Sequence, residues 1–347
     1  MAIPAIAISA RAVPSRNLVE IRMLTHGNGE LLLTISRTGT AVVLGAVARP
    51  SRHLSHIVIP SKLFRMKRSL AVSIVLLLCL STGFAQDWAK QKLDKSTRHG
   101  EWVDIKHDNR TVHAFVVYPE TKAKAPVVIV IHEIFGLTDW ARSVADQLAA
   151  NGYIAIAPDL LSGMGPKGGG TSDFAGTQDA VKGISALDPD QVTADLNATA
   201  DYAKKIPASN GKLAVSGFCW GGGQSFRFAA NRKDLSAAFV FYGPGPKDVS
   251  AITAPVYGFY AGEDARIGAT IPDTQAAMKA ASKKYEPVTY AGAGHGFMRA
   301  GEDPAADEAA KATGDDEKTK KARDMAVANK KAHDEGWQRW LQLLKSM

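Results

Sequence analysis

A cysteine between glycines is the residue of this sequence best suited to covalent chemistry. Cys219 lies in Gly217-Phe218-Cys219-Trp220-Gly221, where a predicted strand meets a predicted helix. A nucleophile elbow has this context: the tight turn holds the central side chain at the sheet edge, and helix amides point at a developing oxyanion. The motif usually carries serine, and a thiol is a strong nucleophile only once it is deprotonated. The alternative is a structural cysteine buried in a glycine-rich turn.

A general base should follow the nucleophile in the chain, and two histidines come after Cys219. His295 lies in Gly292-Ala293-Gly294-His295-Gly296-Phe297, just past a predicted strand, where the base of a triad belongs. His333 lies in a densely charged stretch, where we expect it to be solvated. His295 is therefore the predicted base.

An acid that orients the base should lie between the nucleophile and the histidine in sequence. Asp264, in Gly262-Glu263-Asp264, follows the predicted strand 256–260 and is the favoured candidate; Glu263 and Asp248 are its rivals. The three residues predict a nucleophile, a base and an orienting acid for covalent catalysis through an acyl-cysteine intermediate. A nucleophile, a base and an oxyanion hole suffice for this chemistry, so we expect no metal or organic cofactor.

Strands and helices alternate along the chain in a pattern that can position such a triad. Val127–Ile131 is a continuous β-branched run, as in a strand buried on both faces, and further strands are predicted at 153–157, 212–216, 237–242, 256–260 and 288–290. One helix is predicted from a cap at Thr138 or Asp139 to Asn151-Gly152, and others at 191–205, 220–230 and 272–284. A last helix carries Trp337, Trp340, Leu341 and Leu344 on one face. The pattern predicts an α/β fold with a mostly parallel central sheet and helices on both faces.

Two segments fall outside this alternation. Residues 161–190 are rich in Gly, Ser and Asp, and we expect them to form a cap or lid over the carboxyl edge of the sheet. Residues 302–335 carry ten acidic and seven basic side chains, which favours a solvated helical excursion before the last helix. The sequence has no internal repeat, no P-loop, no Gly-x-Gly-x-x-Gly and no metal-ligand spacing of Cys or His.

The composition is that of an ordinary globular protein, with 46% hydrophobic and 22% charged residues. A formal charge of +8 suggests a nucleic-acid-binding protein. However, residues 1–85 hold ten of the 42 Lys/Arg and only two of the 34 Asp/Glu. The remainder is formally neutral. We therefore expect no nucleic-acid partner.

Residues 66–85 have the pattern of a signal peptide. Lys67 and Arg68 follow Met66, an apolar run spans 70–80, and the small residues Gly83 and Ala85 fit a cleavage site before Gln86. The run is shorter than the roughly 20 residues of a membrane span. We expect an exported protein, periplasmic or secreted, without a membrane anchor after cleavage.

The segments on either side of this signal differ in kind. Residues 1–65 are interpreted as an upstream extension or a disordered leader, with an Arg-containing transit peptide as the alternative. Residues 86–347 suit one α/β domain, which we expect to be monomeric. Since Cys79 lies in the predicted signal peptide, Cys219 is the sole remaining thiol, and an unpaired cysteine in an exported protein suggests reactivity.

Taken together, the motifs resemble those of dienelactone hydrolases, the cysteine-nucleophile branch of the α/β-hydrolase superfamily. The resemblance covers about 98–346. The motifs that carry it are His132-Glu133-Ile134-Phe135-Gly136, Ala157-Pro158-Asp159-Leu160, Gly217-Phe218-Cys219-Trp220-Gly221-Gly222, Gly262-Glu263-Asp264, and Gly294-His295-Gly296-Phe297 with Arg299. Each motif alone is weak, and the combination is specific. The resemblance implies the α/β-hydrolase fold.

The resemblance also implies roles that spacing alone does not show. In the family, the glutamate at the position of Glu133 contacts the resting thiol and takes its proton when substrate displaces it. A thiol that stays neutral until then is slow to oxidise. The alternative is a buried glutamate paired elsewhere. The backbone amides of Ile134 and Trp220 would form the oxyanion hole, and Asp159 is expected to fix its loop and not to take part in catalysis.

Arg299 matches a family arginine that binds a substrate carboxylate, with an exposed loop arginine as the alternative. Dienelactone-specific members carry a second arginine before the nucleophile strand, whereas this sequence has none from 161 to 212 and offers only Lys167 and Lys182 there. Neither lysine gives a bidentate fork. This difference leaves the reaction type unchanged but does not allow the substrate to be identified. We expect an ester or lactone, which can bear a carboxylate that Arg299 binds. The open alternatives are a general carboxylesterase or thioesterase, and a catalytically silent hydrolase fold that acts as a binding protein.

Overall fold

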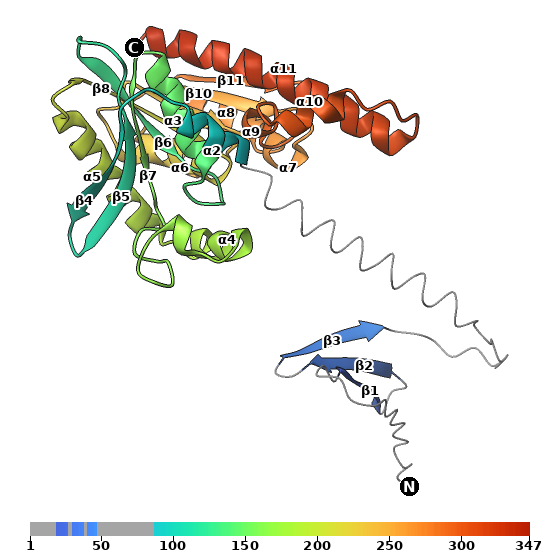
Figure 1. Cartoon of the computed structure of the whole chain (residues 1–347). Helices are drawn as coiled ribbons and strands as arrows, with labels where there is room; N and C mark the ends of the chain where they lie inside the picture. Colours follow the sequence, from blue (N-terminus) through green and yellow to red (C-terminus); the bar gives the residue numbers. More distant parts are fainter. Residues whose placement is uncertain (1–18, 27–29, 38–39, 47–86) are drawn as a thin grey trace. The chain divides into compact units, whose positions relative to one another are not determined.

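The protein is described from a computed structural model, which places residues 19–26, 30–37, 40–46 and 87–347 (Figure 1). The chain divides into two compact units, 1–73 and 74–347. Within the first unit, β1 (Val19–His26), β2 (Glu30–Arg37) and β3 (Thr40–Ala46) form an antiparallel sheet with β2 in the middle. Part of the segment that sequence analysis left outside the fold thus carries strands. The predicted signal peptide lies outside the described residues.

The second unit is built on an eight-stranded sheet. Its strands are β4 (Gly100–His107), β5 (Arg110–Val117), β6 (Ala125–Ile131), β7 (Ile154–Pro158), β8 (Ser209–Phe218), β9 (Ala237–Phe241), β10 (Val256–Ala261) and β11 (Tyr285–Tyr290). They lie in the order β11-β10-β9-β8-β6-β7-β5-β4. The strands from β6 to β11 pair in parallel, whereas β5 is antiparallel to both β7 and β4. This confirms the predicted α/β-hydrolase fold.

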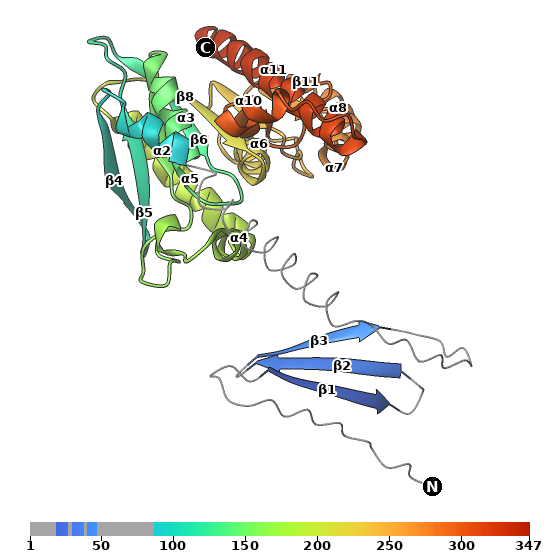
Figure 2. The same cartoon turned by 45° about the vertical axis from the view of Figure 1, so that its right-hand side comes forward.

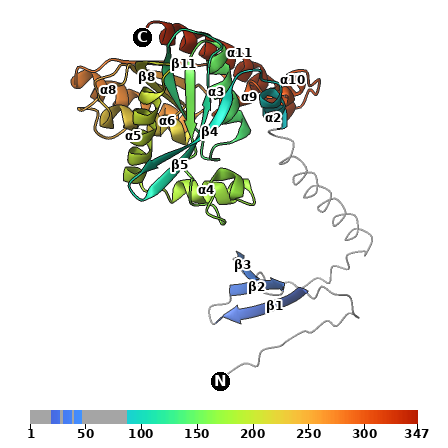
Figure 3. The same ribbon diagram turned by 60° about the vertical axis from the view of Figure 1, so that its left-hand side comes forward.

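Helices cover both faces of this sheet. They are α2 (Asp87–Asp94), α3 (Asp139–Ala150), α4 (Thr177–Ser185), α5 (Pro189–Lys205), α6 (Trp220–Asn231), α7 (Ala265–Gly268), α8 (Ile271–Ala280), α9 (Phe297–Ala300), α10 (Pro304–Ala310) and α11 (Glu317–Lys345). Figure 3 shows α5, α6 and α8 on one side of the strands and α3 on the other. Since side chains alternate along a strand, Ile129 and Ile131 pack with the first set, whereas Val128 and Val130 pack with α3 and α11.

The structure corrects three expectations about the elements. The hairpin of β4 and β5 was not predicted, although β4 forms an edge of the sheet (Figure 2). The charged stretch 302–335 is not an excursion before the last helix, because most of it is the first part of α11, which continues unbroken to Lys345. The helix predicted at 272–284 ends at Ala280, and the chain enters β11 at Tyr285.

The expected cap segment, 161–190, contains α4 and lies apart from the two helix layers (Figure 2). Leu161, Ala180 and Ile184 form a small buried cluster of their own, and Ile134 and Trp220 pack against it. The segment therefore contacts both the residue that follows Cys219 and the loop that follows β6. Within the part of the chain that the structure describes, no helix has both the length and the apolar character that a membrane crossing requires.

Candidate active site

The strand β8 turns into α6 at Cys219, and glycines make this turn possible. A side chain at Gly217 would overlap the backbone of Gly221, and one at Gly221 would overlap the carbonyl oxygens of Ile131 and His132. Cys219 itself has φ of +56°, a conformation that side chains rarely adopt and that is typical of strained functional turns. The close packing of strand and helix therefore holds the thiol at the carboxyl edge of the sheet.

A chain of three side chains extends from the thiol. His295 Nε2 lies 3.0 Å from Cys219 Sγ, and His295 Nδ1 lies 2.5 Å from Asp264 Oδ2. Asp264 is 8% exposed and is the N-cap of α7, where its Oδ1 accepts a hydrogen bond from the amide of Ile267 at 3.2 Å. One carboxylate oxygen thus fixes the aspartate, while the other orients the imidazole.

The rival candidates lie elsewhere. Glu263 is exposed, and Asp248 accepts a hydrogen bond from the amide of Ser250 in its own loop. The expectation that His333 is solvated is wrong. Its side chain is 13% exposed, because α11 turns the imidazole against Trp337.

The surroundings of the thiol favour its neutral form. Burial raises the pKa of Cys219, and the negative charge of Glu133 raises that pKa further. The backbone amides of Trp220 and Ile134 act in the opposite direction, because they hydrogen-bond toward the sulfur, and so does the charge of Arg266. The two amides expected to form the oxyanion hole therefore both lower the pKa of the thiol.

Glu133 forms an ion pair with Arg299. Arg299 Nε donates to Glu133 Oε2 at 2.9 Å, and the carboxylate side chain is 4% exposed. Burial by itself lowers the pKa of Arg299, but the charge and hydrogen bond of Glu133 outweigh it and raise that pKa. The glutamate thus faces Arg299, in place of the thiol contact that the resemblance implied. Arg299 is correspondingly not a free loop arginine.

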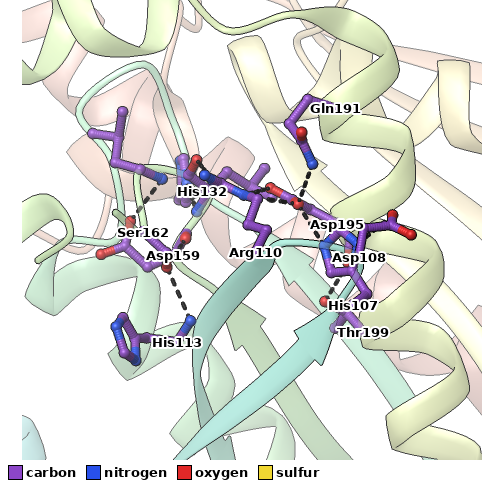
Figure 4. Close-up of polar contacts among 12 residues, drawn as sticks. His107, Asp108, Arg110, His113, His132, Asp159, Ser162, Gln191, Asp195 and Thr199 are labelled. Carbon is purple, nitrogen blue, oxygen red and sulfur yellow. Dashed lines mark hydrogen bonds and ion pairs between the residues drawn. The ribbon is translucent and has the colours of Figure 1, made fainter. Parts of the chain in front are cut away.

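The loop that carries Glu133 and Ile134 is fixed by buried polar groups (Figure 4). His132 is fully buried, lies 2.8 Å from the carbonyl oxygen of Glu133 through Nδ1, and accepts a hydrogen bond from the amide of Leu160 through Nε2. Burial lowers the pKa of His132, so the imidazole is neutral. Its ring also stacks on Trp220, with centroids 5.6 Å apart. One neutral histidine thus connects the loop to the nucleophile turn.

Asp159 holds the next part of the same loop. Its carboxylate accepts hydrogen bonds from the amide and the hydroxyl of Thr171, both at 2.7 Å, and from the amide of Leu161 at 3.1 Å. Thr171 Oγ1 in turn accepts from the amide of Leu137 at 2.9 Å. Asp159 therefore joins the cap segment to the Glu133 loop, in agreement with the expectation that it fixes a loop.

A second buried carboxylate was not anticipated. Asp195 in α5 is fully buried and contacts His107 at 2.8 Å, Arg110 at 3.0 Å and Gln191 at 2.9 Å (Figure 4). These contacts fasten the β4–β5 hairpin to α5. The signal in the sequence is an aspartate on the helix face of Val192 and Leu196, both of which are buried.

Glu302 was also missed. Its carboxylate accepts from Trp140 at 3.0 Å and Gln147 at 2.8 Å, and lies 2.6 Å from Lys92. It therefore fastens the segment that follows Arg299 to α3. Among the described residues, no group of His, Cys, Asp and Glu has an arrangement that could hold a metal ion.

Comparison with known proteins gives consistent results. Residues 112–347 match the model of the "Dienelactone hydrolase family". A Salmonella typhi protein named "Putative carboxymethylenebutenolidase" is 38% identical over 186 residues, which are 50% of this chain and 67% of the relative. The carboxymethylenebutenolidase of Pseudomonas putida is 32% identical over 201 residues, 56% of this chain and 83% of the relative.

A solved structure agrees with the sequence comparisons. The crystal structure of a "Putative Dienelactone Hydrolase" from Klebsiella pneumoniae aligns with a TM-score of 0.57 and 27% identity. The alignment covers 72% of this chain and all of that one. Fold and sequence therefore lead to the same family.

Proposed function

Since the chain belongs to the dienelactone hydrolase family and is a hydrolase of that type, we propose that it cleaves an ester or lactone through an acyl-cysteine intermediate. The observation that carries the proposal is the continuous contact from Cys219 Sγ through His295 to Asp264. This is the nucleophile, base and orienting acid of a triad. The raised pKa of the thiol adds a requirement, because the sulfur needs a proton acceptor before it can attack.

Glu133 is the proposed acceptor, and Arg299 controls it. A substrate anion that binds Arg299 competes with Glu133 for the guanidinium and releases the carboxylate. The freed Glu133 takes the proton of Cys219, and the thiolate attacks the carbonyl carbon. As the carbon–oxygen bond breaks, the leaving oxygen takes the proton from Glu133. The acyl group remains on sulfur as a thioester.

Hydrolysis of the thioester is assigned to His295. The imidazole takes a proton from water, and the resulting hydroxide attacks the thioester carbonyl. Sulfur leaves and receives the proton from His295. Asp264 keeps the imidazole in the required orientation and stabilises its charged form. The amides of Ile134 and Trp220 are proposed to bind the oxyanion in both steps.

The substrate is proposed to be a lactone with a carboxylate. The Pseudomonas putida relative is named for a carboxymethylene-substituted butenolide, which is such a compound. Arg299 supports this choice, because its guanidinium lies next to the proposed acceptor and is partly exposed. A neutral ester is the second candidate, since Arg299 already has a carboxylate partner within the chain.

The test is hydrolysis of a set of carboxylate-bearing lactones and their methyl esters by residues 86–347. The proposal expects turnover of an acidic lactone and trapping of an acyl group on Cys219 by mass spectrometry. The matched control is Cys219→Ala. An acyl adduct at any other residue, or turnover by the alanine variant, would contradict the mechanism.

Export is a separate proposal, based on the leader sequence alone. Intact mass of the protein from its native host should begin at Gln86. A cytoplasmic species that retains residues 1–65 would overturn it.

A further inference from the structure

Tyr242, directly after β9, has two unfavourable features at once. Its φ of +41° is one that bulky side chains rarely adopt. Its side chain is fully buried, yet the hydroxyl has no hydrogen-bond partner among the described residues. A buried donor without a partner costs free energy, and such groups are rare in native proteins. Neither feature helps the fold, which suggests a role for the hydroxyl outside the resting state.

The position of Tyr242 connects both halves of the candidate site. The carbonyl oxygen of the preceding residue, Phe241, accepts the amide of Cys219 at 3.0 Å. The Tyr242 ring lies edge-on to His295, with centroids 5.0 Å apart, and packs against Phe297 at 5.3 Å. The backbone of the β9 end thus fixes the nucleophile turn, while the ring supports the base.

The hydroxyl also lies within the field of the Glu133–Arg299 pair. Burial raises the pKa of Tyr242 well above its ordinary value, the charge of Glu133 and its action as a hydrogen-bond acceptor for the phenol raise that pKa further, and the charge of Arg299 lowers it. Glu133 Oε1 lies next to Gly296, the residue between His295 and Phe297, and the Tyr242 ring contacts both of these side chains. In the resting pair, Arg299 is bonded to Oε2 of Glu133, which leaves Oε1 for another donor. Tyr242 is therefore a phenol without a hydrogen bond of normal length in the described structure, close to a carboxylate that exchanges partners in the proposed reaction.

We propose that Tyr242 is a positioning residue for Glu133. When a substrate anion takes Arg299, the Tyr242 hydroxyl donates a hydrogen bond to the released carboxylate and holds it beside Cys219. The inference rests on the proposed function. It gives the orphaned hydroxyl a partner in the complex, and it keeps Glu133 ionised, and so able to accept the thiol proton, after its counter-ion is lost.

The test compares Tyr242→Phe with Tyr290→Phe. Tyr290 is a matched control, because its hydroxyl is also buried and without a partner in the described structure, and its ring also packs against Phe297, at 5.1 Å. Each variant removes one oxygen atom that forms no hydrogen bond of normal length among the described residues. Both should therefore fold, with a Tm equal to or slightly above that of the parent.

On a carboxylate-bearing lactone, Tyr242→Phe should lower kcat about tenfold or more, the effect of one hydrogen bond to a charged group, with KM within twofold. The acidic limb of the kcat–pH profile should move to higher pH, because the released Glu133 holds a proton more tightly without its donor. Alkylation of the substrate-free thiol by iodoacetamide should not change, since Glu133 is still paired with Arg299. Tyr290→Phe should leave all three readouts unchanged.

Two outcomes would overturn the inference. An unchanged pH profile and kcat would mean that the hydroxyl has no function in the reaction. An equal loss on the acidic lactone and its methyl ester would mean that Tyr242 serves His295 and not Glu133. Both leave the proposed function intact, which fails instead if the parent enzyme hydrolyses neither compound.

Discussion

The two sides of the Cys219 thiol are held in different ways. On one side, backbone geometry fixes the contact: a glycine-lined turn sets the sulfur, and the N-cap of α7 sets the aspartate that orients His295. On the other side, the Glu133 carboxylate is held by a side chain, that of Arg299, 166 residues away in sequence. The first arrangement changes only if the fold changes. In the proposed mechanism, the second changes when a substrate anion replaces Glu133 at the guanidinium.

This difference implies a division of labour. Bond making needs the reacting atoms to be held within about 0.5 Å of their productive positions, and rigid elements provide this precision. Control by substrate needs a contact that exchanges one partner for another, and a largely buried ion pair favours such an exchange, because breaking it without a replacement anion is costly. Variants on the rigid side should therefore abolish turnover for every substrate, whereas variants on the exchangeable side should discriminate between substrates.

The largest effect is expected at the nucleophile. Cys219→Ala should lower kcat by about a hundred thousandfold or more, since no other group can form the acyl intermediate. Cys219→Ser should retain at most a trace, because a hydroxyl is far less acidic than a thiol. Steady-state hydrolysis of an acidic lactone measures both. Appreciable activity of Cys219→Ala would mean that another residue is the nucleophile.

Asp264→Asn should follow, with a loss of about a thousandfold to ten-thousandfold in kcat, because the amide no longer holds the imidazole in the productive orientation. The loss should be the same for acidic and neutral substrates. Glu263→Gln is the control, as it neutralises the exposed neighbouring carboxylate and should not alter turnover. A larger loss of kcat in Glu263→Gln would mean that Glu263, and not Asp264, orients His295.

Glu133→Gln should lower kcat about a hundredfold, which is the range of general acid–base catalysis. The fold should survive, since glutamine keeps the shape. Because the charge of Glu133 raises the pKa of Cys219, its removal should shift the pH midpoint of iodoacetamide alkylation to lower pH. A lower Tm with unchanged turnover per folded molecule would make Glu133 a purely structural residue.

Arg299→Gln should lower kcat/KM tenfold to a hundredfold for carboxylate-bearing lactones, as one charge-assisted contact of roughly 1.5–3 kcal/mol is lost. Neutral esters should change less than threefold. Arg323→Gln, in α11, is a matched control, because the two arginine side chains are 30% and 31% exposed. Equal losses on both substrate classes would show that Arg299 supports the His295 loop and does not bind substrate.

The smallest catalytic effect is expected from Thr171→Val, which removes the hydroxyl between Asp159 and Leu137. The loss of about 1–3 kcal/mol should lower the Tm by roughly 2–10 °C and kcat by less than tenfold. Thr274→Val is the control, because the Thr274 hydroxyl donates to the carbonyl oxygen of Thr270, the N-cap residue of its own helix α8. A loss of kcat in Thr171→Val that differs between acidic and neutral substrates would mean that the cap segment acts through the Glu133–Arg299 pair.

The sequence was most informative where function is tied to local backbone geometry. Gly217, Cys219 and Gly221 predict the elbow because the tight turn demands glycine, and the order Cys219, Asp264, His295 predicts which residues meet there. The pairing of Glu133 with Arg299 has no local signature, because it depends on how two loops approach each other. The positive φ of Tyr242 has none either, since the residue type gives no indication of it.

The helix α11 shows a different limitation. Its first two-thirds are so densely charged that composition alone suggests a solvated segment. Buried positions nevertheless recur along one face, at Ala326, Asn329, Ala332, Gly336, Trp340 and Leu344. The spacing of three or four residues is helical throughout, but small and polar residues occupy the early positions and conceal the stripe from a hydrophobicity pattern.

The neutral resting thiol has a practical consequence for finding inhibitors. Reagents that survey cysteines by their intrinsic reactivity sample the free enzyme, in which burial and Glu133 both raise the pKa of Cys219. Such surveys will rank this cysteine as unreactive, even though it is the proposed nucleophile. Electrophiles that carry their own carboxylate would exchange with Glu133 at Arg299 and so activate the sulfur that they modify. Selective covalent ligands should therefore come from libraries of compounds that combine an anionic group with a weakly reactive electrophile.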